Sequence, residues 1–178
     1  SIFREYDIRG TYPEQINESS IKSIAFAIAK RCKKDNISTL VVGRDGRMSG
    51  PALLEAFCEG LIESGINVDN IGLVTSPLLY FAAKKSASKS GIMITGSHNP
   101  KNYNGIKMVI NDSPISGTEI YTLINHEKNT NLEKGEVQYS DIKPIYLEEV
   151  CNNIFINNPE KIKVVLDCGN GAAGCIAP

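Results

Sequence analysis

The 178-residue sequence predicts an α/β protein with a mixed, largely parallel sheet and helices on both faces. Short apolar runs alternate along the chain with segments whose apolar residues recur at helical spacing. Glycine, proline and serine stand where one kind of segment changes to the other, as is typical of turns. The composition, with 42% hydrophobic and 22% charged residues, excludes a disordered, collagen-like or coiled-coil chain.

The first helix is predicted to begin at Ser19 or Ser20, because either hydroxyl can cap its free amide groups. Its apolar face consists of five residues at helical spacing, Ile21, Ile24, Ala25, Ile28 and Cys32. A strand follows at 40–42, and Ser49 is predicted to cap a second helix. The core face of that helix consists of Leu53, Leu54, Phe57 and Leu61.

The same alternation continues through the rest of the chain. Strands are predicted at 68–74, 92–94 and 106–110, helices at 76–83, 116–126 and 145–154, and a polar loop at 128–135. A further apolar run at 162–166 is predicted to be the first strand of a second α/β domain. We therefore expect a first domain at 1–155, and a linker with the truncated start of a second domain at 156–178.

The charge and the apolar segments limit the possible partners. The net charge of −1 gives no reason to expect a nucleic acid or a membrane as partner. Residues 1–110 nevertheless carry a net charge of +4, which suits an anionic substrate. No apolar stretch is long enough for a membrane span and no signal peptide is recognisable, so we expect a cytoplasmic protein. The five cysteines are expected to be reduced and largely buried.

The densest group of polar residues is Thr-Gly-Ser-His-Asn-Pro at 95–100, directly after a predicted strand. Ligands collect at the carboxyl ends of strands in open α/β sheets, so this turn is a candidate site. The nucleophile elbow lacks its second glycine here, because Asn99 follows His98. A P-loop lacks its lysine. A plain turn and a serine displayed for phosphoryl transfer both remain open.

Two further segments are rich in arginine, residues 3–10 and residues 43–47. The planar guanidinium group suits phosphate because it offers two parallel donors, but surface ion pairs are the favoured explanation for each segment taken alone. A third segment, 164–174, places the glycine pattern of dinucleotide-binding proteins after an apolar run. A glycine-rich turn at the start of a second α/β domain is the preferred explanation, because this glycine pattern is common.

Taken together, these segments resemble the α-D-phosphohexomutase family, and most closely its bacterial phosphomannomutase/phosphoglucomutase branch. The resemblance rests on five motifs in the family's order, at 3–10, 43–47, 95–100, 103–107 and 165–171. It covers nearly the whole chain. It implies domain 1 of a mutase that interconverts the 1- and 6-phosphates of mannose or glucose, with hexose phosphate as its substrate.

The resemblance also implies roles for individual residues. Ser97 would be the catalytic phosphoserine, and Lys107 and Arg9 would be cations beside it and candidates for proton transfer. His98 would support the serine loop or the proton traffic, although adjacent side chains tend to diverge. Tyr6 would lie near the substrate's phosphate, with packing as its main role. Arg44 and Arg47 would support the site rather than contact the sugar.

The family's cofactors are expected only in part. Mg²⁺ would contact a phosphate oxygen on Ser97, but its remaining ligands have no counterpart in this sequence. Glucose or mannose 1,6-bisphosphate would be the activator. The sequence also lacks the motifs of domains 2 to 4, so the chain alone is expected to be inactive. The rival hypotheses are an NAD-dependent dehydrogenase using Gly169 to Gly174, and a phosphosugar-binding module without catalysis.

Overall fold

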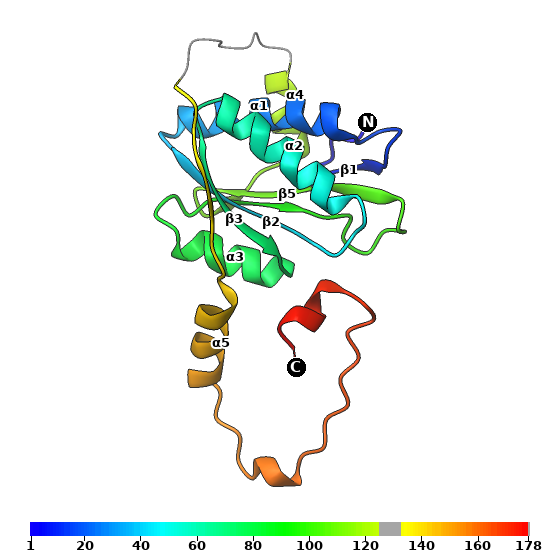
Figure 1. The fold of residues 1–178 in the computed structure, drawn as a ribbon, viewed down its shortest axis with the longest axis vertical. Helices are drawn as coiled ribbons and strands as arrows, with labels where there is room; N and C mark the ends of the chain where they lie inside the picture. Colours follow the sequence, from blue (N-terminus) through cyan, green and yellow to red (C-terminus); the bar gives the residue numbers. More distant parts are fainter. Residues whose placement is uncertain (125–132, 178) are drawn as a thin grey trace.

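A computed structural model describes residues 1–124 and 133–177 and shows an α/β/α arrangement around one seven-stranded sheet (Figure 1). The strands along the sheet are ordered β1-β5-β4-β2-β3-β7, and β6 pairs with β5. The strands are β1 (Ile8–Thr11), β2 (Thr39–Arg44), β3 (Asn67–Leu73), β4 (Gly91–Ile94), β5 (Tyr103–Ile110), β6 (Ser113–Pro114) and β7 (Val137–Tyr139). The predicted fold class is confirmed.

The sheet is mixed in a regular way. β4, β2, β3 and β7 run parallel to one another, whereas β5 is antiparallel to β1, β4 and β6. The antiparallel strand β5 follows β4 after a short loop, which a parallel pair could not do. Sequence analysis placed β2 to β5 but not β1, β6 or β7, because these three strands are short and lie at the margins of the sheet.

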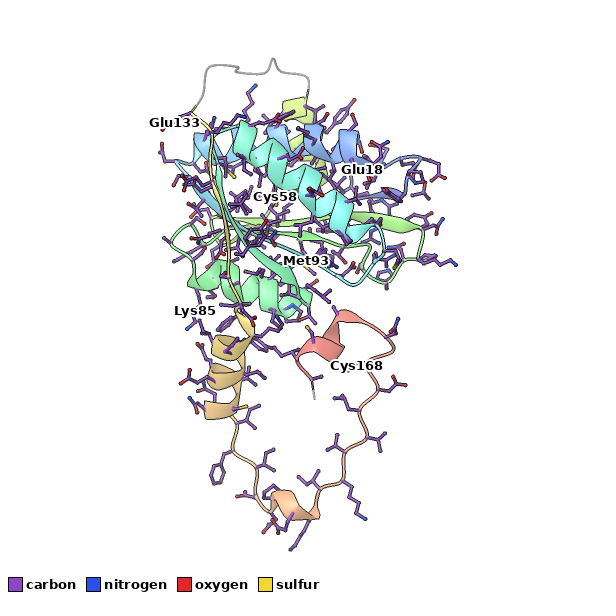
Figure 2. The ribbon with its side chains drawn as sticks, in the orientation of Figure 1. Glu18, Cys58, Lys85, Met93, Glu133 and Cys168 are labelled. Carbon is purple, nitrogen blue, oxygen red and sulfur yellow. The ribbon has the colours of Figure 1, made fainter. Side chains whose placement is uncertain are left out.

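Helices cover both faces. The helices are α1 (Glu18–Lys34), α2 (Gly50–Glu63), α3 (Ser76–Lys85), α4 (Gly117–Ile124) and α5 (Lys143–Asn152). α1, α2 and α4 pack on one face, and α3 packs on the other (Figure 1). In Figure 2, Cys58 lies on the α2 side of the sheet and Met93 on the α3 side. The predicted helix end at His126 and the loop residues 128–132 lie outside the described residues.

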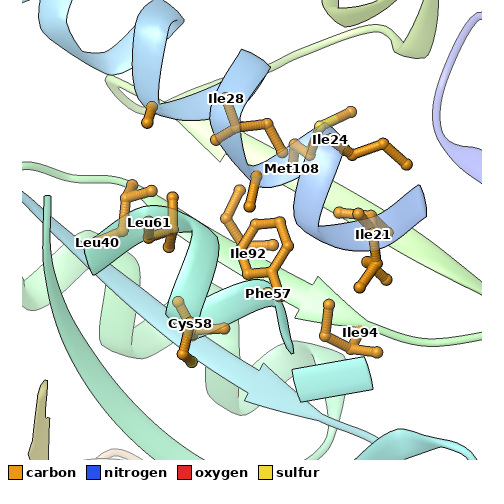
Figure 3. Close-up of a cluster of buried hydrophobic side chains, with 14 of the residues drawn as sticks. Ile21, Ile24, Ile28, Leu40, Phe57, Cys58, Leu61, Ile92, Ile94 and Met108 are labelled. Carbon is orange, nitrogen blue, oxygen red and sulfur yellow. The ribbon is translucent and has the colours of Figure 1, made fainter. Parts of the chain in front are cut away.

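The main core lies between the sheet and the helices α1 and α2 (Figure 3). All the apolar residues predicted for the two helix faces are buried. Phe57 is fully buried among Ile24, Ile92 and Met108 of the same cluster. Burial of such a side chain stabilises the fold by about 1.5–3 kcal/mol.

Both predicted helix caps need correction. Asn17, not Ser19 or Ser20, caps α1: its side chain accepts from the Ser20 amide at 3.0 Å, and the Ser20 hydroxyl accepts from the Asn17 amide. Ser49 does stand at the N-cap position of α2, but its side chain makes no capping hydrogen bond. Its hydroxyl instead accepts a hydrogen bond from Asn104 on β5.

The C-terminal part of the chain differs most from expectation. The run 162–166 was predicted to be a strand, yet it pairs with no strand in the described part of the chain, and four of its apolar side chains are exposed, those of Ile162, Val164, Val165 and Leu166. A strand needs a neighbouring strand to hydrogen-bond with, and none of the described strands pairs with this segment. After α5 the chain turns away from the body and comes back toward it (Figure 1). Cys175 then lies 3.8 Å from the Leu73 carbonyl oxygen.

The cysteines divide between these two regions. Cys32 and Cys58 are buried, and burial raises the pKa of each thiol to about 12. Cys151 is exposed, and Cys168 and Cys175 are half-buried, so the expectation of largely buried thiols was right only for the packed domain. All five are free.

Candidate active site

The motif segments meet at one edge of the sheet. β2 and β4 are parallel, with Arg44 opposite Ile94, so the segments that follow them start side by side. The Asp45 amide donates to the Ile94 carbonyl at 3.0 Å and continues the pairing beyond the strands. The segment after β4, residues 95–102, is called the serine loop below. Ligands of α/β proteins bind at this edge of the sheet.

Arg9 and Lys107 lie on the two strands that extend this edge. Arg9 on β1 pairs with Gly105 on β5, two residues before Lys107. Because Ile8 and Ile106 point into the main core, Arg9 and Lys107 alternate onto the opposite face. Diagonal neighbours of this kind are about 7–8 Å apart. The two predicted cations therefore share one face of the sheet.

These two cations differ in what they contact. Arg9 forms an ion pair with the buried carboxylate of Asp7. Lys107 is partly exposed and has no ion-pair partner among residues 1–124 and 133–177. A Cβ on Gly105 would overlap the Ile8 carbonyl oxygen, so only glycine lets β1 approach β5 this closely.

Ser97 is exposed at the turn of the serine loop and has a left-handed backbone with φ of 55°. L side chains adopt this conformation rarely, so the surrounding contacts must hold it. The Ser97 amide donates to Thr95 Oγ1 at 2.8 Å, and the Asn99 amide donates to the Gly96 carbonyl at 3.0 Å. The loop therefore displays the Ser97 hydroxyl to solvent from a fixed turn.

His98 lies beside the serine rather than away from it. Its Nδ1 is 3.4 Å from Ser97 Oγ, and both side chains are exposed. The expectation that these adjacent side chains diverge was wrong, because it assumed an extended turn and Ser97 is left-handed. The contact is at the long end of hydrogen-bonding distances, yet it places an imidazole within reach of the serine.

Arg47 has the most contacts with the serine loop. Its Nη1 donates to the carbonyls of Pro100 (2.6 Å) and Tyr103 (2.9 Å), and its Nη2 donates to those of Ser97 (2.9 Å) and Asn99 (2.7 Å). Its Nε donates to Asp45 Oδ2 at 3.3 Å. The Arg47 side chain is only 13% exposed.

Asp45 connects Arg47 to the base of the loop. Its Oδ1 accepts from the Arg47 amide at 3.1 Å, and its Oδ2 accepts from Thr95 Oγ1 at 2.6 Å. Since Thr95 Oγ1 in turn accepts from the Ser97 amide, the side chains of Asp45 and Thr95 connect the end of β2 to the serine. Thr95 is buried, so these bonds are shielded from water.

A second connection joins β5 to the start of α2. The fully buried Asn104 donates through Nδ2 to Ser49 Oγ at 2.8 Å, and its Oδ1 accepts from the Gly105 amide at 2.9 Å. This bond explains why the Ser49 hydroxyl does not cap its helix. Asn104 and Ser49 together fix the position of β5 relative to the segment that carries Arg47.

Two other predicted residues lie apart from this network. Tyr6 is 78% exposed, so its predicted packing role is not supported, and its hydrogen bond to Glu5 raises the pKa of the phenol. Arg44 donates from Nη1 to the Asp45 carbonyl at 3.0 Å, which agrees with a supporting role.

Sequence reasoning missed Asp45, Thr95 and Asn104 as parts of the site. Asp45 was weighed only as a surface ion-pair partner, although its Oδ1 accepts from the Arg47 amide and its Oδ2 accepts from Thr95 of the serine loop. One signal was available for Thr95: a Thr two residues before a tight turn often accepts from a nearby backbone amide. No sequence signal identifies Asn104, whose partner is 55 residues away.

The chain's own residues do not fit a complete Mg²⁺ site. Within 1–124 and 133–177 there is no group of three or more His, Cys, Asp or Glu side chains that could hold a metal ion. Asp45, the carboxylate attached to the serine loop, already accepts from Arg47 and Thr95. Mg²⁺ needs close to six oxygen ligands, which this set does not supply.

The glycine pattern at 169–174 lacks the structure that dinucleotide binding requires. That motif needs a strand before the glycines and a helix after them. The chain has no strand at 162–166, and the glycines lead into a short 3₁₀ helix, Ala172–Cys175. The dehydrogenase hypothesis therefore finds no support in this segment. Among the described residues, none of the helices combines the length and apolar character needed to cross a membrane.

Comparison with known proteins agrees with this geometry. Residues 1–131 match the family described as phosphoglucomutase/phosphomannomutase, alpha/beta/alpha domain I. The chain is 43% identical over 180 residues to a phosphomannomutase/phosphoglucomutase of Pseudomonas syringae pv. tomato, and 38% identical to a phosphoglucomutase of Neisseria gonorrhoeae. All of this chain is covered in the first case and 99% in the second.

Its structure is also similar to that of a phosphoglucomutase/phosphomannomutase family protein from Burkholderia thailandensis. The TM-score is 0.91 at 34% identity, over 99% of this chain and 40% of that protein. The chain spans 38% of the length of the Pseudomonas relative and 39% of the Neisseria relative. On the match at residues 1–131, the chain belongs to the phosphoglucomutase/phosphomannomutase family and contains its domain I.

Proposed function

We propose that Ser97 carries a phosphoryl group between O1 and O6 of a mannose or glucose phosphate. The observation that carries this proposal is the position of Ser97. It is exposed on a left-handed turn at the carboxyl edge of the sheet, with two cations on the adjoining strands β1 and β5. Phosphoryl transfer depends mainly on positioning and charge neutralisation, and this edge offers both.

The reaction consists of two transfers. In the first, the free hydroxyl of the hexose monophosphate attacks phosphorus and loses its proton, while the Oγ–P bond of phosphorylated Ser97 breaks and Ser97 Oγ takes up a proton. The product is a hexose 1,6-bisphosphate. After this intermediate reorients in the site, the Ser97 hydroxyl attacks its other phosphorus and loses its proton, while the bond from that phosphorus to the sugar oxygen breaks and the sugar oxygen takes up a proton. The enzyme returns to the phosphoserine form, and the phosphate has moved between O1 and O6.

Arg9 and Lys107 have different roles in this proposal. Arg9 is held in an ion pair with Asp7, and we assign it to neutralising phosphate charge rather than to moving protons. Lys107 has no ion-pair partner in the described part of the chain and is the better candidate for proton transfer. His98, 3.4 Å from Ser97 Oγ, supports the serine or accepts its proton. Tyr6, exposed before β1, is available to the substrate's phosphate.

The proposal concerns the full-length protein, because the chain spans 38% of a relative's length. We place the domain boundary near residue 155 and expect residues 1–178 alone to be inactive. When Mg²⁺ is bound, a phosphate oxygen on Ser97 would be the ligand that this chain supplies to it. Glucose or mannose 1,6-bisphosphate is the proposed activator, and the cytoplasm the proposed location.

Intact-mass measurement tests the phosphoserine. The full-length protein is incubated with glucose 1,6-bisphosphate, and peptide mapping locates any added phosphate. We expect one phosphate on Ser97 and none in Ser97→Ala. Ser88→Ala is a matched control on another loop, because Ser88 hydrogen-bonds to Ser86 and Ser90 rather than to the serine loop.

The same experiment separates the remaining alternative. A non-catalytic phosphosugar-binding module would bind the bisphosphate without a covalent mass change. If the protein binds the sugar but consistently gains no phosphate, or gains it at another residue, the proposed function is wrong.

A further inference from the structure

We propose that Arg47 is a positioning residue that holds the serine loop in its displayed conformation and does not bind substrate phosphate. An arginine beside a phosphoryl-transfer site would ordinarily be assigned to phosphate recognition. The contacts of Arg47 lead to a different assignment.

The hydrogen bonds of Arg47 occupy its whole guanidinium group. A guanidinium has five N–H donors: one on Nε and two on each terminal nitrogen. Nε donates once, to Asp45, and Nη1 and Nη2 each donate to two backbone carbonyls of residues 97–103. No donor is left for a phosphate oxygen. Binding a ligand would require Arg47 to release part of the loop.

The carbonyls that Arg47 engages span the turn around the nucleophile. Those of Ser97, Asn99, Pro100 and Tyr103 all face one planar group. Arg47 holds the Ser97 carbonyl, and Thr95 Oγ1 accepts a hydrogen bond from the Ser97 amide. Ser97 is therefore held at both its backbone groups. This accounts for the left-handed backbone of Ser97, which an unsupported loop would leave.

Gly96 is the steric counterpart of Arg47. A Cβ built on Gly96 would overlap the guanidinium carbon and come within 2.8 Å of Nη1. A side chain at position 96 would therefore displace the guanidinium from the loop. Gly96 and Arg47 form one contact, and a change in either should have the same result.

Lysine cannot replace Arg47 in this role. An ammonium group keeps the charge but offers three donors from a single point, whereas the four carbonyls face two separate nitrogens in a plane. Arg47→Lys thus tests geometry at constant charge. It also retains most of the aliphatic side chain.

Hydrogen exchange on the full chain tests the contact directly. We expect Arg47→Lys to raise the exchange rates of the Ser97, Asn99 and Tyr103 amides about tenfold or more, and to leave α1 amides unchanged. Arg44→Lys is the matched control on the same segment, because the Arg44 side chain donates to the Asp45 carbonyl and not to the serine loop. It should leave the serine loop protected. If the serine-loop amides of Arg47→Lys exchange at the wild-type rates, the proposal is wrong.

Gly96→Ala provides the second variant and a double-mutant cycle. Alone it should increase exchange of the same amides, whereas in the Arg47→Lys background it should add little, since the contact is already lost. If the two effects are fully additive, Gly96 and Arg47 act separately and the proposed contact is wrong.

Kinetics distinguish positioning from binding, and this part rests on the proposed function. In the full-length enzyme, we expect Arg47→Lys to lower kcat about tenfold or more while KM for hexose phosphate stays within about twofold. A large rise in KM with kcat unchanged would assign Arg47 to phosphate binding and overturn the proposal. If the wild-type enzyme lacks mutase activity, the proposed function fails, and the exchange results still decide the role of Arg47.

Discussion

The serine loop lies between two flanks that both carry cations but use them differently. On the β2 flank, residues 44–49, every donor of Arg47 is engaged by backbone carbonyls or by Asp45. On the β5 flank, residues 103–107, Lys107 has no ion-pair partner in the described part of the chain. One cation maintains the shape of the site, and the other is available to a ligand.

This difference shows why charge alone does not identify a phosphate-binding residue. Both flanks contain residues of motifs that were selected from the sequence, and both lie at the carboxyl edge of the sheet. Whether a cation can bind phosphate depends on how many of its donors remain unused. The following predictions test that division between the flanks.

The largest effect is expected on the β5 flank. Lys107→Ala should lower the turnover of the full-length enzyme by about 10²- to 10⁴-fold, because it removes the cation best placed for proton transfer. Its free energy of unfolding should change by no more than about 0.5 kcal/mol, because no ion pair is lost. Steady-state kinetics and urea unfolding measure the two quantities.

Lys101→Ala is the control for this variant, since Lys101 is an exposed lysine of the serine loop itself. It should leave turnover within about twofold. If Lys107→Ala lowers the free energy of unfolding but leaves turnover unchanged, Lys107 is a structural residue and the role assigned to the β5 flank is wrong.

The next effect concerns the β2 flank. Asp45→Asn should lower the free energy of unfolding by about 2–4 kcal/mol, because an amide donor would then face Thr95 and Arg47 and leave a half-buried guanidinium without its counter-charge. Glu59→Gln removes a similar charge from the exposed pair with Lys22 and should cost about 0.5 kcal/mol or less. Equal costs in urea unfolding would show that the Asp45 network is no stronger than a surface ion pair.

The sequence was sufficient to predict the parts of the fold that depend on periodicity. The buried face of α1, the strands β2 to β5 and the turn that carries Ser97 all follow from local patterns. The run 162–166 shows the limit of that reasoning. Its composition is typical of a strand, yet a strand forms only where another offers hydrogen bonds, which is not a local property.

The site was predictable in a similar way. Ser97, His98, Arg9 and Lys107 could be selected because each belongs to a motif. The functions of Asp45, Thr95 and Asn104 could not, because each depends on a partner at least 50 residues away. Likewise, only the folded structure shows that every side-chain donor of Arg47 is engaged.

A smaller effect is expected where the two flanks are joined. Ser49→Ala should lower the free energy of unfolding by about 1–3 kcal/mol, because it leaves the buried Asn104 amide without an acceptor. Thr75 occupies the equivalent N-cap position of α3, also without a capping bond. Thr75→Ala should therefore change stability by about 0.5 kcal/mol or less in the same urea titration. A neutral Ser49→Ala would mean that Asn104 does not depend on this bond.

The smallest effect concerns Tyr12, which follows β1 and donates to Glu18 Oε1 on α1 at 2.8 Å. The Glu18 backbone amide first, and then Tyr12, lower the pKa of the Glu18 carboxyl, whose unfolded value is near 4.5. This stabilisation is present above that value and is lost as the pH falls through the folded pKa. The bond to Glu18 raises the pKa of Tyr12 above 10.0, so its contribution is present below 10.0 and is lost as the pH rises through the folded pKa.

Tyr12→Phe should therefore lower stability most near neutral pH and less at either extreme. Part of the loss of stability at acid pH should remain, because the backbone hydrogen bond to the Glu18 carboxylate is kept. The loss of stability at alkaline pH that is due to Tyr12 should disappear. Urea midpoints at acid, neutral and alkaline pH measure this, with Tyr139→Phe as the control because that side chain is 80% exposed. If the stability of both variants depends on pH as that of the wild type does, the Tyr12–Glu18 bond does not anchor β1. The position of Arg9 beside β5 would then depend on the β1–β5 pairing and on the ion pair with Asp7 alone.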